Sequence, residues 1–193
     1  LPIYGKPDLV TANSDSNSLS ILLGQGAGRF AAAVSLPVGA FPSDLSVADL
    51  DSDGKLDLVV AADGARQLQL FLGFGDGSFF PSKLSLARPL SGPIAVADHN
   101  QDGKPDLLFG RYVYQGSGSG SFTLYSSSLP IQPPRQVLLD LDNDGSLDLV
   151  GAGSASSVLS VLPGTSSVAF GFASTPNGYS SGAVIEDVAI AKM

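Results

Sequence analysis

The sequence of 193 residues contains no cysteine, no tryptophan and one methionine, and only 15% of its residues are charged. The lack of cysteine excludes disulfides and thiolate metal sites. Ten lysines and arginines stand against 18 aspartates and glutamates, which gives a formal charge of −8. Such a chain cannot supply the basic surface that neutralises phosphates, so we expect no nucleic-acid partner. No run approaches the ~20 apolar residues of a membrane-spanning helix, so we expect no membrane span.

The residue types that usually carry catalysis are also scarce. The one histidine, His99, falls at the second position of an aspartate-rich loop, where we expect its side chain to point into solvent. A Ser-His-Asp site would require this histidine, and no G-x-S-x-G nucleophile turn is present. Most of the acidic residues belong to repeated aspartate-rich loops. No motif brings two of the remaining acidic residues together as a catalytic acid and base. We therefore predict that the chain is not an enzyme.

Turn-forming residues are abundant instead. The chain has 23 glycines and 13 prolines, and 44% of its residues are hydrophobic. This composition is globular rather than disordered, and it favours short strands joined by many turns.

Two motifs recur in a constant order along the chain. The first, D-x-[DN]-x-D-G-x-x-D-L, occupies residues 49–58, 98–107 and 140–149, and a partial copy opens the chain at residues 5–10. The second is a glycine turn, G-x-G-x-G-x-F, at residues 24–30, 73–79 and 116–122, with a degenerate copy at 164–170. The last aspartates of the first motif are 49, 49 and 42 residues apart (8 to 57, 57 to 106, 106 to 148). These motifs predict one domain over residues 1–193, with repeats at about 5–53, 54–102, 103–144 and 145–193.

Four short apolar runs per repeat predict four strands. They lie before the aspartate loop (45–48, 94–97, 137–139, 188–191), after it (56–61, 107–110, 147–151) and before the glycine turn (19–23, 68–72). After each turn an aromatic residue is expected to open the last strand, as at residues 79–84. Four strands in 42–49 residues are the content of a propeller blade. We therefore predict an all-β fold, a β-propeller of four four-stranded blades. The runs that flank the loops are continuously apolar, so we expect those strands to be buried on both faces.

The two ends of the chain read as parts of one blade. Residues 182–191 align with residues 39–48, and Lys192 stands where Asp49 would be. Placed after residues 192–193, residues 1–5 would complete one degenerate aspartate loop. This pattern predicts a ring closed by the C-terminal strand, which would pair with Leu9 and Val10, and the same strand offers a route to self-assembly between chains. A segment of a longer propeller is the alternative that the sequence leaves open.

The aspartate loops have the composition of a calcium site. Alternate side chains at positions 1, 3, 5 and 9, with the carbonyl of position 7, converge on one point, and calcium takes six to eight oxygen ligands. An EF-hand is excluded because its glutamate at position 12 is replaced by Val60, Phe109 and Gly151. We predict about three Ca²⁺ per chain. The predicted ligands are Asp49, Asp51, Asp53, Lys55 and Asp57, then Asp98, Asn100, Asp102, Lys104 and Asp106, then Asp140, Asp142, Asp144, Ser146 and Asp148.

With these loops and glycine turns, the chain resembles the FG-GAP/VCBS repeat family, the calcium-loop propeller repeats that also occur in integrin α-subunit heads and some fungal lectins. The resemblance implies a propeller with Ca²⁺ in a hairpin loop of each blade, an extracellular or cell-surface location, and adhesion to, or recognition of, a protein or glycan ligand. The opening copy departs from the pattern because only Gly5 and Asp8 remain of its loop, and no fourth calcium is expected there.

Three functions remain open at this point. The first is a non-catalytic adhesion or recognition module, the second a structural subunit of a surface fibre or larger assembly, and the third, ranked last, a polysaccharide hydrolase or lyase. Exposed aromatic residues would offer stacking faces to a sugar. Tyr112, Tyr114, Tyr125 and Tyr179 are the candidates, although half-buried strand tyrosines would explain them equally. Serine and threonine clusters at 126–128 and 165–167 are either O-glycan acceptors or polar loops.

Overall fold

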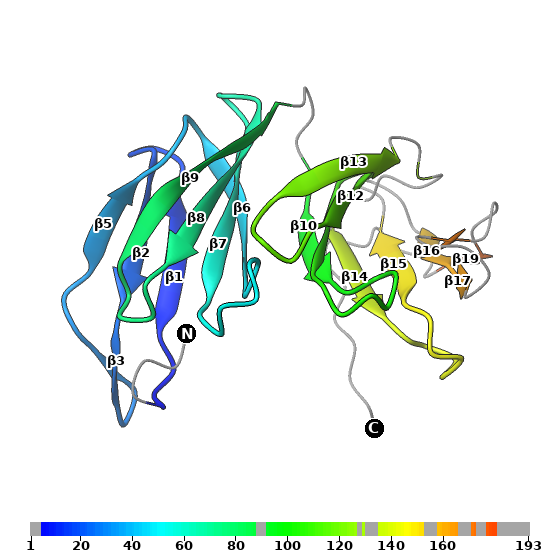
Figure 1. Cartoon of the computed structure of the whole chain (residues 1–193), viewed down its shortest axis with the longest axis horizontal. Coiled ribbons are helices and arrows are strands. Elements are labelled where there is room, and N and C mark those ends of the chain that lie inside the picture. Colours follow the sequence, from blue (N-terminus) through cyan, green and yellow to red (C-terminus); the bar gives the residue numbers. More distant parts are fainter. Residues whose placement is uncertain are drawn as a thin grey trace. The chain divides into compact units, whose positions relative to one another are not determined.

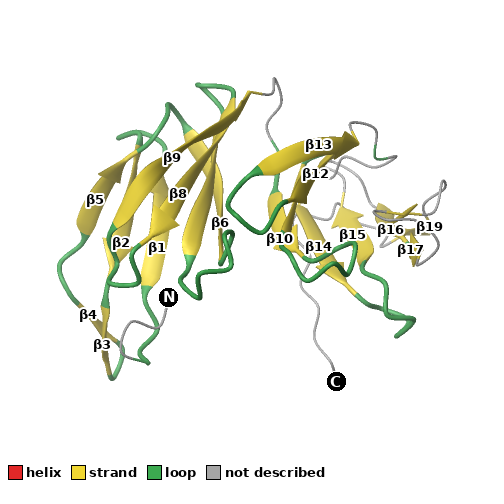
Figure 2. Cartoon of the chain, viewed as in Figure 1, coloured by secondary structure: helices red, strands yellow, loops and turns green. Residues whose placement is uncertain are grey.

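A computed structural model describes residues 5–87, 92–126, 129, 135–152, 158–165, 171–172 and 177–180. Every regular element in this part of the chain is a β-strand, and all the strand pairs are antiparallel (Figures 1 and 2). No helix long and apolar enough to cross a membrane occurs among these residues. The chain divides into two compact units, Leu1–Ser91 with Ser117–Ser121, and Gly92–Gly116 with Phe122–Met193.

The first unit contains two sheets. The first sheet has three strands in the order β1-β2-β5, formed by β1 (Leu9–Asn13), β2 (Ser18–Leu22) and β5 (Val34–Pro37). A two-stranded hairpin of β3 (Gly24–Gly26) and β4 (Arg29–Phe30) interrupts it at the glycine turn. The second sheet is a meander in chain order, with β6 (Pro42–Ala48), β7 (Asp57–Ala62), β8 (Gln67–Gly73) and β9 (Phe79–Ala87).

Apolar side chains from both sheets form the core of this unit. Its centre is the buried cluster Leu19, Leu58, Val60 and Phe71, against which half-buried residues such as Val10, Leu36 and Phe79 pack. All six residues of β7 are buried, as a strand with a neighbour on each edge and side chains on each face requires. The strands β1 and β6, the first described strands of their sheets, lie beside each other.

The second unit repeats the meander twice. The third sheet consists of β10 (Ile94–Ala97), β11 (Asp106–Phe109), β12 (Tyr112–Gly116) and β13 (Phe122–Ser126). The fourth consists of β14 (Arg135–Leu139), β15 (Asp148–Ala152), β16 (Val158–Leu162) and β19 (Asn177–Ser180), with a small hairpin of β17 (Gly164–Thr165) and β18 (Gly171–Phe172). Leu108, Val113, Leu129, Leu149 and Leu162 form its core.

Three of the four sheets have the four strands that a blade was predicted to contain. Each of the second, third and fourth sheets has four strands, and each aspartate loop joins the first strand to the second. The first sheet has three strands among the described residues, and the predicted strand at 188–191 lies outside them. The fold is therefore all-β, with four small antiparallel sheets, and the second, third and fourth sheets each take their first strand from the end of the preceding predicted repeat.

Two expectations about the strands are wrong. The strand that precedes each loop is not buried on both faces, because all four residues of β10 are only half-buried and Val47 on β6 is 36% exposed. The strands that follow the loops match the expectation, because β7 and β11 are buried throughout and so are the residues of β15 whose burial is described, 148–151. In the first repeat the aromatic residue after the turn, Phe30, ends the β3–β4 hairpin instead of opening the outer strand. The extra residues between Phe30 and β5 make this possible.

Candidate metal sites in the aspartate loops

Each aspartate loop is a tight connection with two left-handed backbone positions. The fourth residue has φ of 63° at Ser52, 60° at Gln101 and 61° at Asn143. The sixth residue is glycine, with φ between 82° and 89° in the three loops. A Cβ on any of these three glycines would meet no atom within 4 Å, so backbone conformation rather than space demands glycine here. The predicted role of this glycine in turning the loop is confirmed.

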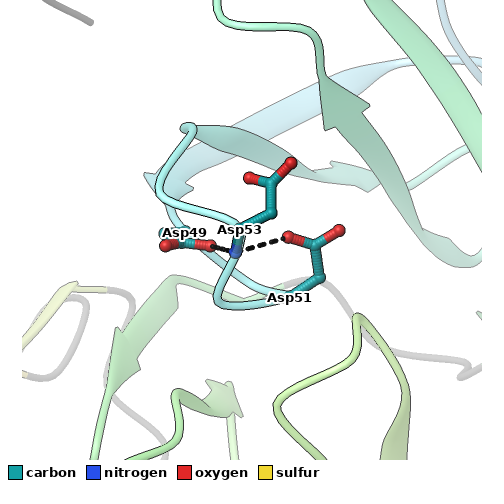
Figure 3. Close-up of side chains that lie close together, drawn as sticks. All are labelled: Asp49, Asp51 and Asp53. Carbon is teal, nitrogen blue, oxygen red and sulfur yellow. Dashed lines mark hydrogen bonds between the residues drawn. The ribbon is translucent and has the colours of Figure 1, made fainter.

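The carboxylate at position 1 organises each loop. Asp49 accepts hydrogen bonds from the Asp53 amide to Oδ1 (3.1 Å) and from the Gly54 amide to Oδ2 (2.9 Å), and Asp51 accepts from the same Asp53 amide (3.2 Å; Figure 3). The other two loops repeat this arrangement with distances of 2.8–3.1 Å: Asp98 and Asn100 accept from Asp102 and Gly103, and Asp140 and Asp142 accept from Asp144 and Gly145. Three segments of different sequence thus adopt one hydrogen-bonding pattern.

The residue at position 5 accepts from the amide of position 7 in every loop, at 2.8 Å in the Lys55–Asp53 pair, 3.0 Å in the Lys104–Asp102 pair and 2.7 Å in the Ser146–Asp144 pair. Where position 7 is lysine, its ammonium group also approaches the carboxylate. Lys55 Nζ lies 2.6 Å from Asp53 Oδ2, and Lys104 Nζ lies 3.9 Å from Asp102 Oδ2. The hydrogen bonds from Lys55 lower the pKa of Asp53, and the hydrogen bond to Asp53 raises the pKa of Lys55.

The spacing of the carboxylates fits a hard cation. One oxygen from each of Asp49, Asp51 and Asp53 lies within 4.8 Å of the others, and the same holds for Asp140, Asp142 and Asp148. Two ligands of one calcium ion, each at about 2.4 Å, are at most about 4.8 Å apart, so both groups satisfy this limit. The 98–106 loop has the amide of Asn100 at position 3, which offers an oxygen but no charge. Carboxylates this close repel one another, so a bound cation would offset the repulsion within the loop.

The aspartate at position 9 differs from the others because it is buried. Asp57, Asp106 and Asp148 are at most 3% exposed. Each accepts an amide at the start of its own loop: Leu50 donates to Asp57 (2.8 Å), His99 to Asp106 (3.1 Å) and Leu141 to Asp148 (2.8 Å). Burial raises the pKa of Asp57 and of Asp106, although the backbone amides oppose the shift. These carboxylates hold the loop closed, and Asp148 also has an oxygen within 4.8 Å of oxygens of Asp140 and Asp142.

The other oxygen of each position-9 aspartate accepts the first amide of the glycine turn. The pairs are Gly73 with Asp57 (2.8 Å), Gly116 with Asp106 (2.9 Å) and Gly164 with Asp148 (2.7 Å). A Cβ on these glycines would lie 1.9–2.5 Å from the carbonyl oxygen of the residue before the aspartate, so no other residue fits. We call this pairing the Asp–Gly clasp. The clasp links each aspartate loop to the glycine turn that follows it. This explains why the two motifs alternate in the same order along the chain.

Sequence reasoning did not foresee the clasp, although its signal was present. The interval from aspartate to glycine is 16 residues in three repeats and ten in the third, where β11 has four residues and two residues separate it from β12. The degenerate first repeat keeps the clasp as well: the Gly24 amide donates to Asp8 at 2.5 Å, and a Cβ on Gly24 would lie 1.9 Å from the Pro7 carbonyl oxygen. Asp8 has therefore kept its structural partner in a loop that has lost its other acids.

The expectation that His99 points into solvent is wrong. The His99 side chain is 7% exposed, and burial lowers its pKa, an effect that the Asp98 carboxylate opposes. Leu50, at the same position of the 49–57 loop, is 1% exposed, whereas Leu141 in the 140–148 loop is 42% exposed. Position 2 is thus buried in two of the three loops. The bond from its amide to the carboxylate at position 9 does not decide this, because Leu141 makes the same bond and is exposed.

The four tyrosines considered as sugar-stacking residues differ in how deeply they are buried. Tyr114 is fully buried and Tyr112 is half-buried, with ring centroids 6.5 Å apart, so neither offers a stacking face. Tyr125 and Tyr179 are about half exposed. The exposed aromatic residues Phe30, Phe41, Phe74 and Phe80 were not among the candidates. The signal for Phe74 and Phe80 is that the other repeats carry small or polar residues at their positions. The serine clusters at 126–128 and 165–167 lie mostly outside the described residues.

Comparison with known proteins assigns these repeats to a family. The family model described as FG-GAP-like repeat matches residues 5–60 and again residues 49–109, which together cover more than half of the chain. The chain belongs to the FG-GAP-like repeat family. The first match begins at the partial aspartate loop and the second at the first complete one, and each includes one whole Asp–Gly clasp.

One solved structure has the same fold over most of the chain. It is the crystal structure of the V. cholerae biofilm matrix protein Bap1, with a TM-score of 0.51 and 21% sequence identity. The match covers 82% of this chain and 31% of Bap1, so the chain spans about a third of the length of that protein. No curated protein sequence matches the chain.

Proposed function

We propose that the chain is a non-catalytic, extracellular module of the adhesion or matrix type, whose FG-GAP-like repeats are stabilised by calcium and present a surface to protein or glycan partners. The observation that carries this proposal is the threefold recurrence of one loop geometry with oxygen donors only. Catalytic sites are rarely repeated in this way, whereas stabilising ions in repeat proteins occur once per repeat. The fold shared with a biofilm matrix protein is consistent with this role.

Calcium fits the three complete loops and would supply the positive charge that they lack. In the 49–57 loop the ligands would be the carboxylates of Asp49, Asp51, Asp53 and Asp57 with the carbonyl of Lys55. The residues Asp98, Asn100, Asp102, Lys104 and Asp106 would serve in the second loop, and Asp140, Asp142, Asp144, Ser146 and Asp148 in the third. Calcium accepts this mixture of carboxylate, amide and carbonyl oxygens, whereas magnesium requires stricter octahedral geometry.

The architecture that we propose is a ring of four blades. Three meandering sheets of four strands and one of three are what a four-bladed propeller contains when its last strand comes from the other end of the chain. Residues 182–191, which repeat the sequence pattern of 39–48 on β6, would provide that strand beside β1. The same edge of β1 supports the second candidate function, a subunit of a fibre or larger assembly, because a strand from a neighbouring chain would fit there equally.

Calcium titration under native conditions tests the proposal. The protein is freed of metal with a chelator and its thermal unfolding is followed as Ca²⁺ or Mg²⁺ is added. Because an ion that binds the folded state stabilises it by RT ln(1 + [L]/Kd), we expect the melting temperature to rise with Ca²⁺ and to rise much less with Mg²⁺ at the same concentration. An unfolding temperature that does not respond to Ca²⁺ would remove the basis of the proposal.

A further inference from the structure

Two exposed phenylalanine rings stand together on the glycine turn of the second sheet. Phe74 is 58% exposed and Phe80 is 45% exposed, although both belong to a sheet with a well-formed core. Their ring centroids are 5.8 Å apart and their planes are inclined by 34°. The Phe74 amide donates to the Ser78 carbonyl oxygen at 3.0 Å, which fixes the turn from which the ring projects. Large apolar side chains exposed as a pair on an ordered turn call for an explanation.

The other repeats show that the fold does not need these rings. Phe79, between them in sequence, is the aromatic residue that recurs in all four turns, and it packs against the core. At the position of Phe74 the other turns carry Gln25, Ser117 and Thr165, and at the position of Phe80 they carry Ala31, Thr123 and Gly171. The third turn forms the equivalent hydrogen bond, from the Ser117 amide to the Ser121 carbonyl oxygen at 2.9 Å, with serine and threonine at the two positions. Packing and turn formation do not account for the two phenylalanines.

The same turn carries a carboxylate. Asp76, at the tip of the turn, accepts hydrogen bonds from the Ser78 amide (2.9 Å) and the Ser78 hydroxyl (2.5 Å), and the same bonds lower its pKa. It is therefore ionised at neutral pH, and its position is held by two bonds. A carboxylate accepts about four hydrogen bonds, so acceptor capacity remains for a ligand. The corresponding residues in the first and third turns are Ala27 and Ser119, so the charge is also particular to this turn.

We propose that Phe74, Phe80 and Asp76 form a carbohydrate-binding site, which stacks the flat C–H face of a pyranose on the two rings and accepts its hydroxyl hydrogen bonds at the carboxylate. The size of the group favours a sugar over a protein. Two phenyl rings bury at most about 150–250 Å² each, well below the roughly 1,000 Å² that a stable protein interface needs. The mixture of apolar faces with one oriented acceptor suits a ligand that is apolar on its ring faces and polar at its edge. Chains with equatorial linkages present such faces on successive sugars.

This inference rests on the proposed recognition function, for which it names the ligand class. It can fail separately from the calcium proposal because none of its three residues is a predicted metal ligand. The test uses the calcium-loaded full chain and two probes, cellohexaose and chitohexaose, with binding measured by isothermal titration calorimetry. The key variant is Phe74→Gln with Phe80→Thr, which takes both residues from corresponding positions of other turns in this chain. It should therefore fold, and an unchanged melting temperature in Ca²⁺ checks this.

We expect the native chain to bind at least one of the two hexasaccharides and the double variant to bind it at least tenfold more weakly. Asp76→Ser, which introduces the residue type that Ser119 provides in the third turn, should weaken binding severalfold while leaving the rings in place. Tyr179→Ser is the matched control, because it removes a ring that is 56% exposed in the fourth sheet and should leave the affinity unchanged. The proposal is overturned if neither hexasaccharide binds, or if binding survives the loss of both rings. A protein ligand that depends on the rings, without sugar binding, would overturn the carbohydrate assignment as well.

Discussion

The carboxylate of Asp57 accepts the amide of Gly73 at 2.8 Å across an interval of 16 residues, and its second oxygen accepts the amide of Leu50 at the same distance. One buried side chain thus holds the aspartate loop and the glycine turn of the second sheet together. The equivalent bond from glycine to aspartate is present in all four sheets, including the one whose loop has lost its other acids. The clasp is therefore a property of the repeat itself, separate from its capacity to bind metal.

The Asp–Gly clasp predicts that adding one methyl group to its glycine lowers the stability of the fold by an unusually large amount. Gly73→Ala would place a Cβ 2.2 Å from the Leu56 carbonyl oxygen, so the turn must move and the hydrogen bond to Asp57 must lengthen. We expect a loss of about 2–4 kcal/mol in the free energy of unfolding, from the steric clash and the weakened hydrogen bond. Urea denaturation in chelator measures it without any contribution from calcium.

Gly54→Ala is the matched control for this substitution. Its Cβ would meet nothing within 4 Å, and only the φ of 82° opposes it. That conformation costs an alanine about 1–2 kcal/mol. If Gly73→Ala costs no more than Gly54→Ala, the clasp does not constrain the turn.

A second prediction separates the metal ligands from the clasp. Asp53 and Asp144 are exposed residues at position 5 of complete loops, so Asp53→Ala or Asp144→Ala should clearly lower the free energy of unfolding in Ca²⁺ and change it little in chelator. Asp8→Ala removes a hydrogen bond to Gly24 in a loop without other ligands. Its cost should therefore be the same with and without Ca²⁺. Urea titrations of the three variants in both buffers measure these costs. If Ca²⁺ changes the cost of all three substitutions equally, the prediction is wrong.

His99 predicts a dependence of stability on pH. Burial lowers the pKa of His99 in the folded chain, so the neutral form is favoured there and the unfolded chain binds the proton more readily. The stabilising contribution is thus fully present above the unfolded pKa of about 6.5 and is lost as the pH falls through and below it. The Asp98 carboxylate reduces this effect without reversing it.

The variant His99→Leu isolates this contribution, because leucine occupies the same position, fully buried, in the 49–57 loop. In chelator, we expect the native chain to lose stability relative to the variant as the pH falls from about 7.5 to about 5, as followed by thermal unfolding. A stability difference between the two proteins that stays constant over this range would show that His99 does not titrate on unfolding.

Closure of the ring predicts the effect of a deletion. Without residues 182–193 the proposed partner of β1 is absent, and an unpaired edge strand promotes association between chains. We therefore expect the truncated protein to form oligomers or aggregates under conditions in which the full chain does not, as measured by light scattering after size-exclusion chromatography. A truncated protein that has the same mass in solution and the same melting temperature as the full chain would contradict closure by this segment.

Much of the fold follows from the sequence because the repeats supply several views of one structure. The apolar runs at 94–97 and 107–110 match β10 and β11 to within a residue, since each loop fixes the ends of its two strands. What could not be predicted depends on contacts between segments. The half-buried first strands and the buried His99 depend on neighbouring chain segments, which a local pattern does not contain. Position 9 was recognised as a ligand position, but its hydrogen bond to the glycine turn requires the strands β7 and β8 to be paired in register.

The number of calcium ions bound per chain tests the central claim most directly. The protein is dialysed against buffer with a small excess of Ca²⁺, and the metal that remains with it is measured by atomic emission against the protein concentration. Three complete loops of the same geometry predict about three ions per chain, and Asp53→Ala should reduce the number by about one. Fewer than two ions per chain would contradict the account, because at least two of three loops with the same hydrogen-bonding pattern would then hold no calcium.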